Sequence, residues 1–197
     1  MANHLGIYSF SQSLADFLGQ SYASFTPDPG TGSLPSVQFE ALSSSDFNSD
    51  KEVKDKVTLY LYRITPNNQL RNVRVGQAAG AVGLNLHYLL TIWTDTLEDE
   101  QTMMGWAIRE LHYHSFLDRS SLPAEAGWPI DESVSIVPED LATEEMSRIW
   151  DMARRSYRLS YPFLARIVRL VKASPDNTTP AVATRFTLAD NLEEREP

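Results

Sequence analysis

The stretch LNLHYLLTIW (residues 84–93) decides the fold of this chain. Its apolar residues recur at every second position, and one side would carry Leu84, Leu86, Tyr88, Leu90 and Ile92. The other side would carry Asn85, His87, Leu89, Thr91 and Trp93. A period of two is that of a β-strand, whose successive side chains point to opposite faces of a sheet. We therefore predict a strand here, with the first side facing the core.

Other strands are predicted around this one. VTLYLYRIT (57–65) is rich in β-branched and aromatic residues, which favour strands. SYPFLARIVRLVK (160–172) has apolar residues on both faces, which indicates a central position in the sheet. Residues 37–42 and 134–137 are predicted as short strands. The polar stretch 43–56 and the Pro- and Gly-containing stretches 26–36, 66–83 and 117–131 are predicted as loops.

Helices are predicted between these strands. Residues 5–22 and 94–116 carry apolar residues at helical spacing, and acids at 98–100 suit the first turn of the second helix. A third helix would place Pro138 at its first position and end near Arg158. Its apolar stripe would be Met146, Ile149, Trp150, Ala153 and Tyr157. The prediction is one α+β domain over residues 1–173, with a mixed or antiparallel sheet, about three helices and no second core.

Composition limits the possible functions. The 197 residues include no cysteine, which excludes disulfides and thiolate chemistry, and the N-terminus does not read as a secretory signal. A cytoplasmic site of folding is expected. The net charge is −9, yet residues 148–172 hold seven basic residues and one acid. This segment would either meet an acidic partner, such as another copy, or face the protein's own carboxylates. The acidic whole disfavours nucleic-acid binding.

No pattern in the sequence indicates catalysis, a cofactor or a metal. Phosphate-loop, nucleophile-elbow and zinc-protease motifs are absent. His112 and His114 lie two apart on a predicted helix and cannot share a metal. The acid pairs at 98–100, 139–140 and 144–145 fall in predicted first turns of helices, where the helix dipole accounts for them. For His87 we predict a hydrogen-bonded structural role.

Three stretches together resemble a known family. They are LYLYRITPNNQLRN (59–72), LNLHYLLT (84–91) and IWDMARRSYRLSYPFLARIVRL (149–170). In this order and spacing they are similar to the N-terminal domain of the cap proteins of extracellular contractile injection systems, of the antifeeding-prophage and virulence-cassette type. This chain has Gly83-Leu84 where the family often has Pro-Leu. Some relatives carry a substantial further C-terminal region, in place of which residues 174–197 are a short acidic tail.

The resemblance implies a structural protein, not an enzyme. It implies a homo-hexameric ring that closes the end of the inner tube farthest from the baseplate and engages the last sheath layer. The expected partners are the tube and sheath proteins, with no nucleic acid and no direct membrane contact. Assembly would be cytoplasmic, within a particle that can be released from the cell. Within the tail, TRFTLA (184–189) would add as a strand to a neighbouring subunit, unless the tail is simply disordered.

The matched stretches supply the candidate core and interface residues. Tyr60, Tyr88 and Trp150 are expected to pack in the core, and His87 and Thr91 to lie at an interface or under a helix. Loop-fixing or neighbour-contacting roles are expected for Arg63, Asn67, Arg71 and Asn72. The turn into the last strand adds Arg154, Arg155, Tyr157, Arg158 and Ser160. The alternatives are another ring or adaptor of the same particle, a small cytoplasmic enzyme, or a sheet-based binding module.

Overall fold

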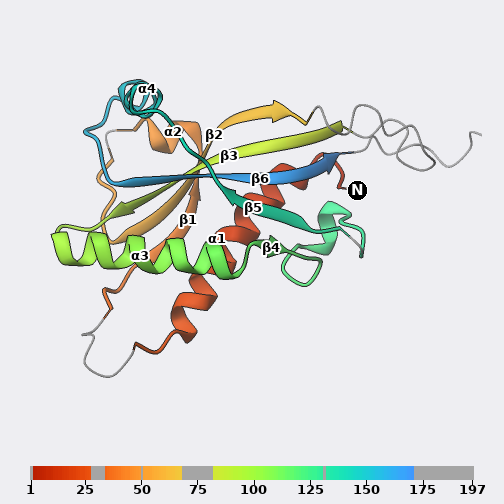
Figure 1. Ribbon diagram of the computed structural model, residues 1–197, viewed down its shortest axis with the longest axis horizontal. Helices are drawn as coiled ribbons and strands as arrows, with labels where there is room; N and C mark the ends of the chain where they lie inside the picture. Colours follow the sequence, from red (N-terminus) through yellow and green to blue (C-terminus); the bar gives the residue numbers. More distant parts are fainter. Residues whose placement is uncertain (1, 28–33, 50, 68–81, 131, 171–197) are drawn as a thin grey trace, which may run out of the picture.

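The computed structural model describes residues 2–27, 34–49, 51–67, 82–130 and 132–170. Its centre is a six-stranded sheet in the order β1-β2-β3-β6-β5-β4 (Figure 1). The strands are β1 (Gln38–Leu42), β2 (Lys56–Pro66), β3 (Val82–Trp93), β4 (Phe116–Leu117), β5 (Val134–Pro138) and β6 (Ser160–Leu170). β1 runs parallel to β2 and every other pair is antiparallel. The predicted mixed sheet and the central position of the last strand are confirmed.

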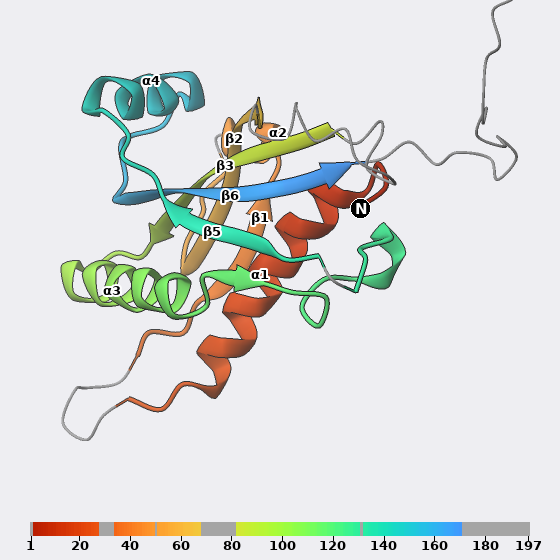
Figure 2. The same ribbon diagram turned by 45° about the vertical axis from the view of Figure 1, so that its right-hand side comes forward.

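Helices cover both faces of this sheet. The α-helices are α1 (Gly6–Ser24), α2 (Ser44–Phe47), α3 (Leu97–Tyr113) and α4 (Thr143–Ala153), and η3 (Ala124–Ala126) is a 3-10 turn. α1 and α3 lie on one face, whereas α4 and α2 lie on the other (Figures 1 and 2). The predicted single α+β domain with about three helices is therefore confirmed, and the one-turn α2 is an addition.

The two faces of β3 belong to two separate apolar clusters. Leu86, Tyr88, Leu90 and Ile92 lie in the main core, which α1 and α3 complete. Leu89 and Trp93 lie in a second cluster on the opposite face, with the other buried members Phe47, Ile149, Trp150 and Ala153. The prediction of no second core is wrong, because α2 and α4 bury the face of β3 that the sequence marks as less apolar.

The helix boundaries also differ from prediction. Residues 43–56 contain α2, whose first turn is capped by the Ser43 side chain accepting from the Asp46 N–H. Pro138 ends β5 instead of starting a helix, and α4 begins five residues later. α4 ends at Ala153 and not near Arg158, because Arg154 adopts a left-handed conformation with φ 52°.

The region after α3 is less irregular than predicted. α3 ends at Tyr113, and the predicted loop 117–131 contains part of β4 and the turn η3. The two-residue strand β4 is too short to leave a periodic signal. The middle of the predicted loop 66–83 and the whole tail 174–197, with TRFTLA, lie outside the described residues.

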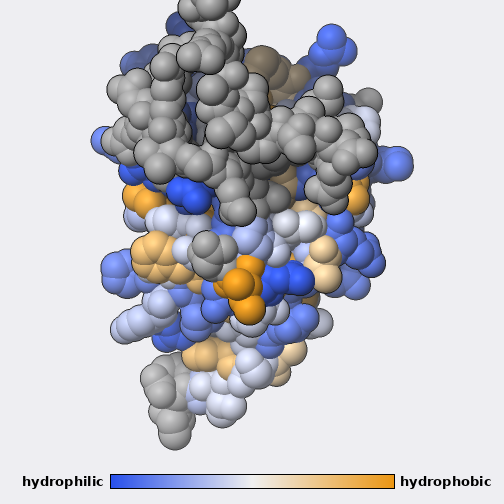
Figure 3. Space-filling view, turned by 90° about the vertical axis from the view of Figure 1, so that its right-hand side faces the viewer, coloured by the Kyte–Doolittle hydropathy of each residue, from blue (hydrophilic) through white to orange (hydrophobic). Residues whose placement is uncertain are grey.

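The N-terminal segment is fixed to the end of β6. The Ala2 N–H donates to the Arg169 carbonyl at 2.8 Å, and Ala2 bridges Leu170 in parallel. A side chain at Gly6 would approach the Ala2 and Leu170 side chains to 2.6 and 2.8 Å. Only glycine therefore lets α1 begin this close to β6. On this end of the molecule, the visible apolar side chains are separated by hydrophilic ones (Figure 3).

Candidate interaction surfaces

A partly buried polar network lies on the α4 face of the sheet. His87 Nδ1 is 2.7 Å from Glu139 Oε1, and the Tyr62 hydroxyl donates to Glu139 Oε2 at 2.8 Å. His87 Nε2 is 2.8 Å from the Thr65 hydroxyl. Because a carboxylate only accepts, Nδ1 of His87 must carry the hydrogen of its bond to Glu139. Arg63 adds an ion pair to Glu139 at 3.6 Å.

The network holds the connection from β5 to α4 onto the sheet. Glu139 directly follows β5, and its N–H donates to the Pro162 carbonyl of β6. Its carboxylate then reaches across β6 to β3 and β2, along the path on which the chain crosses β6 in Figure 1. Burial, followed by the hydrogen bond to Glu139, raises the pKa of Tyr62. The predicted first-turn role of Glu139 is wrong, whereas Glu144 and Glu145 do lie in a first turn.

A second polar group follows α4. The Arg155 guanidinium donates through Nη2 to the carbonyls of Ser49 and Lys51, and it lies 5.3 Å from the Trp93 ring. Arg158 donates to the Thr94 carbonyl at 3.2 Å. Neither arginine forms an ion pair with a carboxylate in the described part of the chain. Lys54, with a smaller contribution from the Arg158 charge, holds the pKa of Asp95 below its usual range, so internal charge neutralisation applies in part to Arg158. Both arginines also hold backbone segments together.

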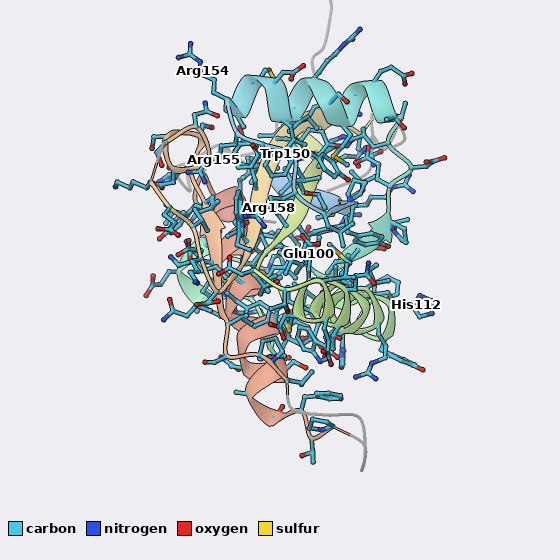
Figure 4. All side chains as sticks on the ribbon, turned by 90° about the vertical axis from the view of Figure 1, so that its left-hand side faces the viewer. Glu100, His112, Trp150, Arg154, Arg155 and Arg158 are labelled. Carbon is cyan, nitrogen blue, oxygen red and sulfur yellow. The ribbon has the colours of Figure 1, made fainter. Side chains whose placement is uncertain are left out.

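Arg154 behaves differently from its neighbour. The Arg154 side chain is exposed and extends from the end of α4 away from the protein (Figure 4). The Arg155 and Arg158 side chains instead lie against the body of the protein. The charge of Arg154 is therefore available to a partner. Met152 and Tyr157, near it in sequence, are 68% and 61% exposed. This end of α4 combines a cation that has no ion-pair partner among the described residues with exposed apolar side chains, a combination that is enriched at interfaces.

The contrast predicts different effects for two adjacent substitutions. Arg155→Lys should lower the free energy of unfolding by about 1–2 kcal/mol, because a lysine ammonium cannot lay a flat guanidinium plane over the Trp93 ring while it also reaches the two carbonyls. Arg154→Lys, the matched control, should leave it unchanged. Urea denaturation measures both, and hydrogen exchange should accelerate at residues 45–53 only in Arg155→Lys. Equal stabilities of the two variants would show that the Arg155 contacts contribute nothing.

The remaining candidates divide between core and connections. Tyr88 and Trp150 are buried, and Tyr60 stacks on Phe47 with ring centroids 4.0 Å apart. Thr91 is buried and its hydroxyl lies 3.0 Å from that of Ser160, which joins β3 to β6. Trp150 belongs to α4, and its side chain points from that helix toward the sheet (Figure 4).

Asn67 fixes the end of the β2–β3 pair. It is buried, and its side-chain amide donates to the Asn85 side chain at 2.9 Å. Its backbone N–H donates to the Gly83 carbonyl. Arg71 and Asn72 lie outside the described residues, so their expected contacts stay predictions.

Sequence patterns did not identify Glu139, Tyr62 or Phe47 as members of these groups. Glu139 has no periodic signal because it acts after a strand and before a helix. Phe47 is a lone aromatic residue in the polar stretch 43–56, and the polar composition of that stretch predicted a loop. In the structure Phe47 is only 2% exposed.

The described residues include an open groove but no group of side chains suited to a metal ion. An open groove of about 600 Å³ lies between α3, β5 and β6, and no carboxylate is among the residues that line it. No group of three or more histidine or acidic side chains in the described ranges could hold a metal ion. Within the same ranges, no helix has the length and apolarity needed to cross a bilayer.

Two solved structures from contractile injection systems are similar to this chain. A solved structure described as the sheath/tube terminator of an extracellular contractile injection system, PVC, in the extended state, matches 95% of this chain with a TM-score of 0.52 and 15% identity. This chain spans 63% of that protein's length. The cap of the anti-feeding prophage, described as a tube-terminating cap, matches 68% of this chain with a TM-score of 0.46 and 18% identity. The match covers 49% of the cap's own length.

No curated protein matches the sequence. At 15% identity, the match to the terminator structure establishes the fold as that of a tail terminator, as the sequence predicted. The profile of the Pvc16 N-terminal domain family matches residues 10–184, which is most of the chain. The chain belongs to the Pvc16 N-terminal domain family.

Proposed function

We propose that this chain is a structural tail terminator, or cap, of a contractile injection system. The observation that carries this proposal is the agreement of its fold, over 95% of its length, with a sheath/tube terminator. The match of the Pvc16 N-terminal domain profile over residues 10–184 supports it independently. In this role the chain forms a homo-hexameric ring, closes the distal end of the inner tube and engages the last layer of sheath.

The physical requirements of a terminator fit this protein. A tube of stacked rings exposes the same surface at its end after every addition, so it continues to grow until another protein covers that surface. A closed ring needs a heterologous interface, in which one patch of a subunit meets a different patch of the next. The two faces of this sheet carry different helices, which supplies two such patches. No catalytic step is part of this role.

Two expectations about the ends of the chain belong to the same proposal. Residues 1–173 form the terminator domain, and the acidic tail 174–197 extends from it toward a sheath or cap subunit. TRFTLA within the tail adds as a strand to that neighbour. The particle assembles in the cytoplasm and is afterwards released. Among the matched motifs, Arg71 and Asn72 either fix their loop by hydrogen bonds or contact a neighbouring subunit.

The test is to mix the purified full chain with tube protein during tube growth. We expect rings of about six copies at one end of each tube, and tubes that stop lengthening as the chain is added. Electron microscopy of stained particles gives both the position of the rings and the length distribution, and tube protein alone is the control. Binding along the tube wall, binding at the baseplate end, or unchanged tube lengths would contradict the proposal.

A further inference from the structure

We infer that α3 of one copy packs antiparallel against α4 of the next copy, through paired charges at both ends of the two helices. This inference rests on the proposed function, since it assigns the contact that closes the ring. Both helices lie on the outside of the molecule, on opposite faces of the sheet (Figures 1 and 2). One copy therefore cannot bring them together, and a contact between copies would be heterologous, as ring closure requires.

α3 presents opposite charges at its two ends. Glu98 lies exposed in its first turn, and Arg109 lies exposed near its last turn, over the Phe25 ring at 4.7 Å. Neither residue forms an ion pair with another described residue. They are eleven positions apart, or about 16 Å along the helix axis at ~1.5 Å per residue.

α4 repeats the pattern in the same direction. Glu144 lies exposed in its first turn, and Arg154 lies exposed at its C-cap. They are ten positions apart, or about 15 Å. In the described residues these two side chains also lack an ion-pair partner. Each helix therefore offers an unpaired acid and an unpaired base at almost the same separation.

Antiparallel packing pairs all four charges at once. When Arg154 lies opposite Glu98, Arg109 falls opposite residue 143 and therefore within one position of Glu144. Parallel packing would instead place acid against acid and base against base, which opposes association. The charges thus specify both the direction and the register of the contact.

The middle of α3 leaves room for a second helix. Gly105 is exposed, and a Cβ built there would meet no atom within 4 Å. In the register set by the charges, Gly105 lies opposite Ser147 and Arg148 of α4, both of which are exposed. A small residue at the crossing point lets two helices approach to the usual distance of about 8–10 Å between axes.

Charge reversal tests the contact in the full chain. Arg154→Glu and Glu98→Arg should each weaken self-association by about tenfold or more, since each places like charges opposite each other. The combined Arg154→Glu, Glu98→Arg variant should recover association to within a few-fold of the original chain. Sedimentation velocity over a range of concentrations measures this. Glu125→Arg, an exposed reversal away from both helices, is the matched control and should change nothing.

The outcomes separate this inference from the proposed function. Single reversals that leave association unchanged, or a combined variant no better than the single ones, would overturn the α3–α4 contact. If those variants still formed rings that stop tube growth, the proposed function would stand without it. An original chain that neither associates nor binds tube ends would overturn both.

Disulfide trapping gives a second, independent readout because the chain contains no cysteine. Under mild oxidation, a mixture of Gly105→Cys and Ser147→Cys chains should form a covalent heterodimer, since the register brings these positions to the crossing point. A single chain with both substitutions should form a ladder that ends at the ring. Replacing Ser147→Cys with Ala124→Cys, also at an exposed position, should abolish the cross-link. Equal yields from the two pairings would exclude the register.

Discussion

Trp150→Ala should lower the free energy of unfolding by about 3–5 kcal/mol, the largest effect of any single substitution considered for this protein. Trp150 is 2% exposed at the centre of the second cluster. Its ring lies 5.5 Å from that of Phe47 and 6.0 Å from that of Trp93, so truncation leaves a cavity between α4, α2 and β3. Urea denaturation measures the loss, and we expect the slope of the unfolding free energy against urea concentration to stay unchanged.

Two controls make this prediction specific. Trp150 Nε1 is buried without a hydrogen-bond partner in the described residues. Trp150→Phe removes that unsatisfied donor while keeping most of the ring, so we expect it to cost only about 1–2 kcal/mol. Met152→Ala, at a largely exposed position of the same helix, should stay within about 0.5 kcal/mol of the original chain. A loss below about 1 kcal/mol in Trp150→Ala would mean that α4 contributes little to the fold.

Glu139→Ala should cost about 2–3 kcal/mol, because it removes the shared acceptor of a partly buried polar group. The buried His87 and the half-buried Tyr62 would each keep a donor without its acceptor. The segment that leads from β5 to α4 would also lose its attachment to β3. We expect chemical denaturation to show the loss, and hydrogen exchange to show faster opening of α4 than of α1.

Glu139→Gln separates hydrogen bonding from charge. The glutamine oxygen can still accept from His87, and its amide can donate to the Tyr62 hydroxyl oxygen. We expect a loss of about 1 kcal/mol, clearly less than in Glu139→Ala. Equal losses in the two variants would mean that the charge on the carboxylate, and not the hydrogen-bond geometry, stabilises this connection.

The elements that could be predicted from the sequence are those whose periodic pattern of apolar residues continues over many positions. The alternation in residues 84–93 identified the central strand, and apolar residues on both sides of 160–172 correctly indicated a strand inside the sheet. Helix boundaries were less predictable because they depend on single residues. Arg154 ends α4 by adopting a left-handed backbone conformation. Arginine has no special preference for that conformation, so the sequence does not predict it.

The candidate site was only partly predictable for a related reason. His87 could be assigned a hydrogen-bonded structural role from its place on a strand, and the structure shows the bonds. Its partner Glu139 could not be identified, since 52 residues separate the two and the contact depends on how the chain crosses β6. The second cluster was missed because it draws single residues from a short helix, a strand and α4.

The position of β6 has a mechanical consequence. β6 lies between β3 and β5, hydrogen-bonded on both sides, and the chain leaves it at Leu170. A pull on residues beyond 170, directed along the strand, would stress those two ladders in shear, so that many bonds must break together. An edge strand pulled sideways would instead open one bond at a time. If the proposed tail holds the sheath, the domain would resist the tension of contraction at a strand that is hydrogen-bonded on both sides.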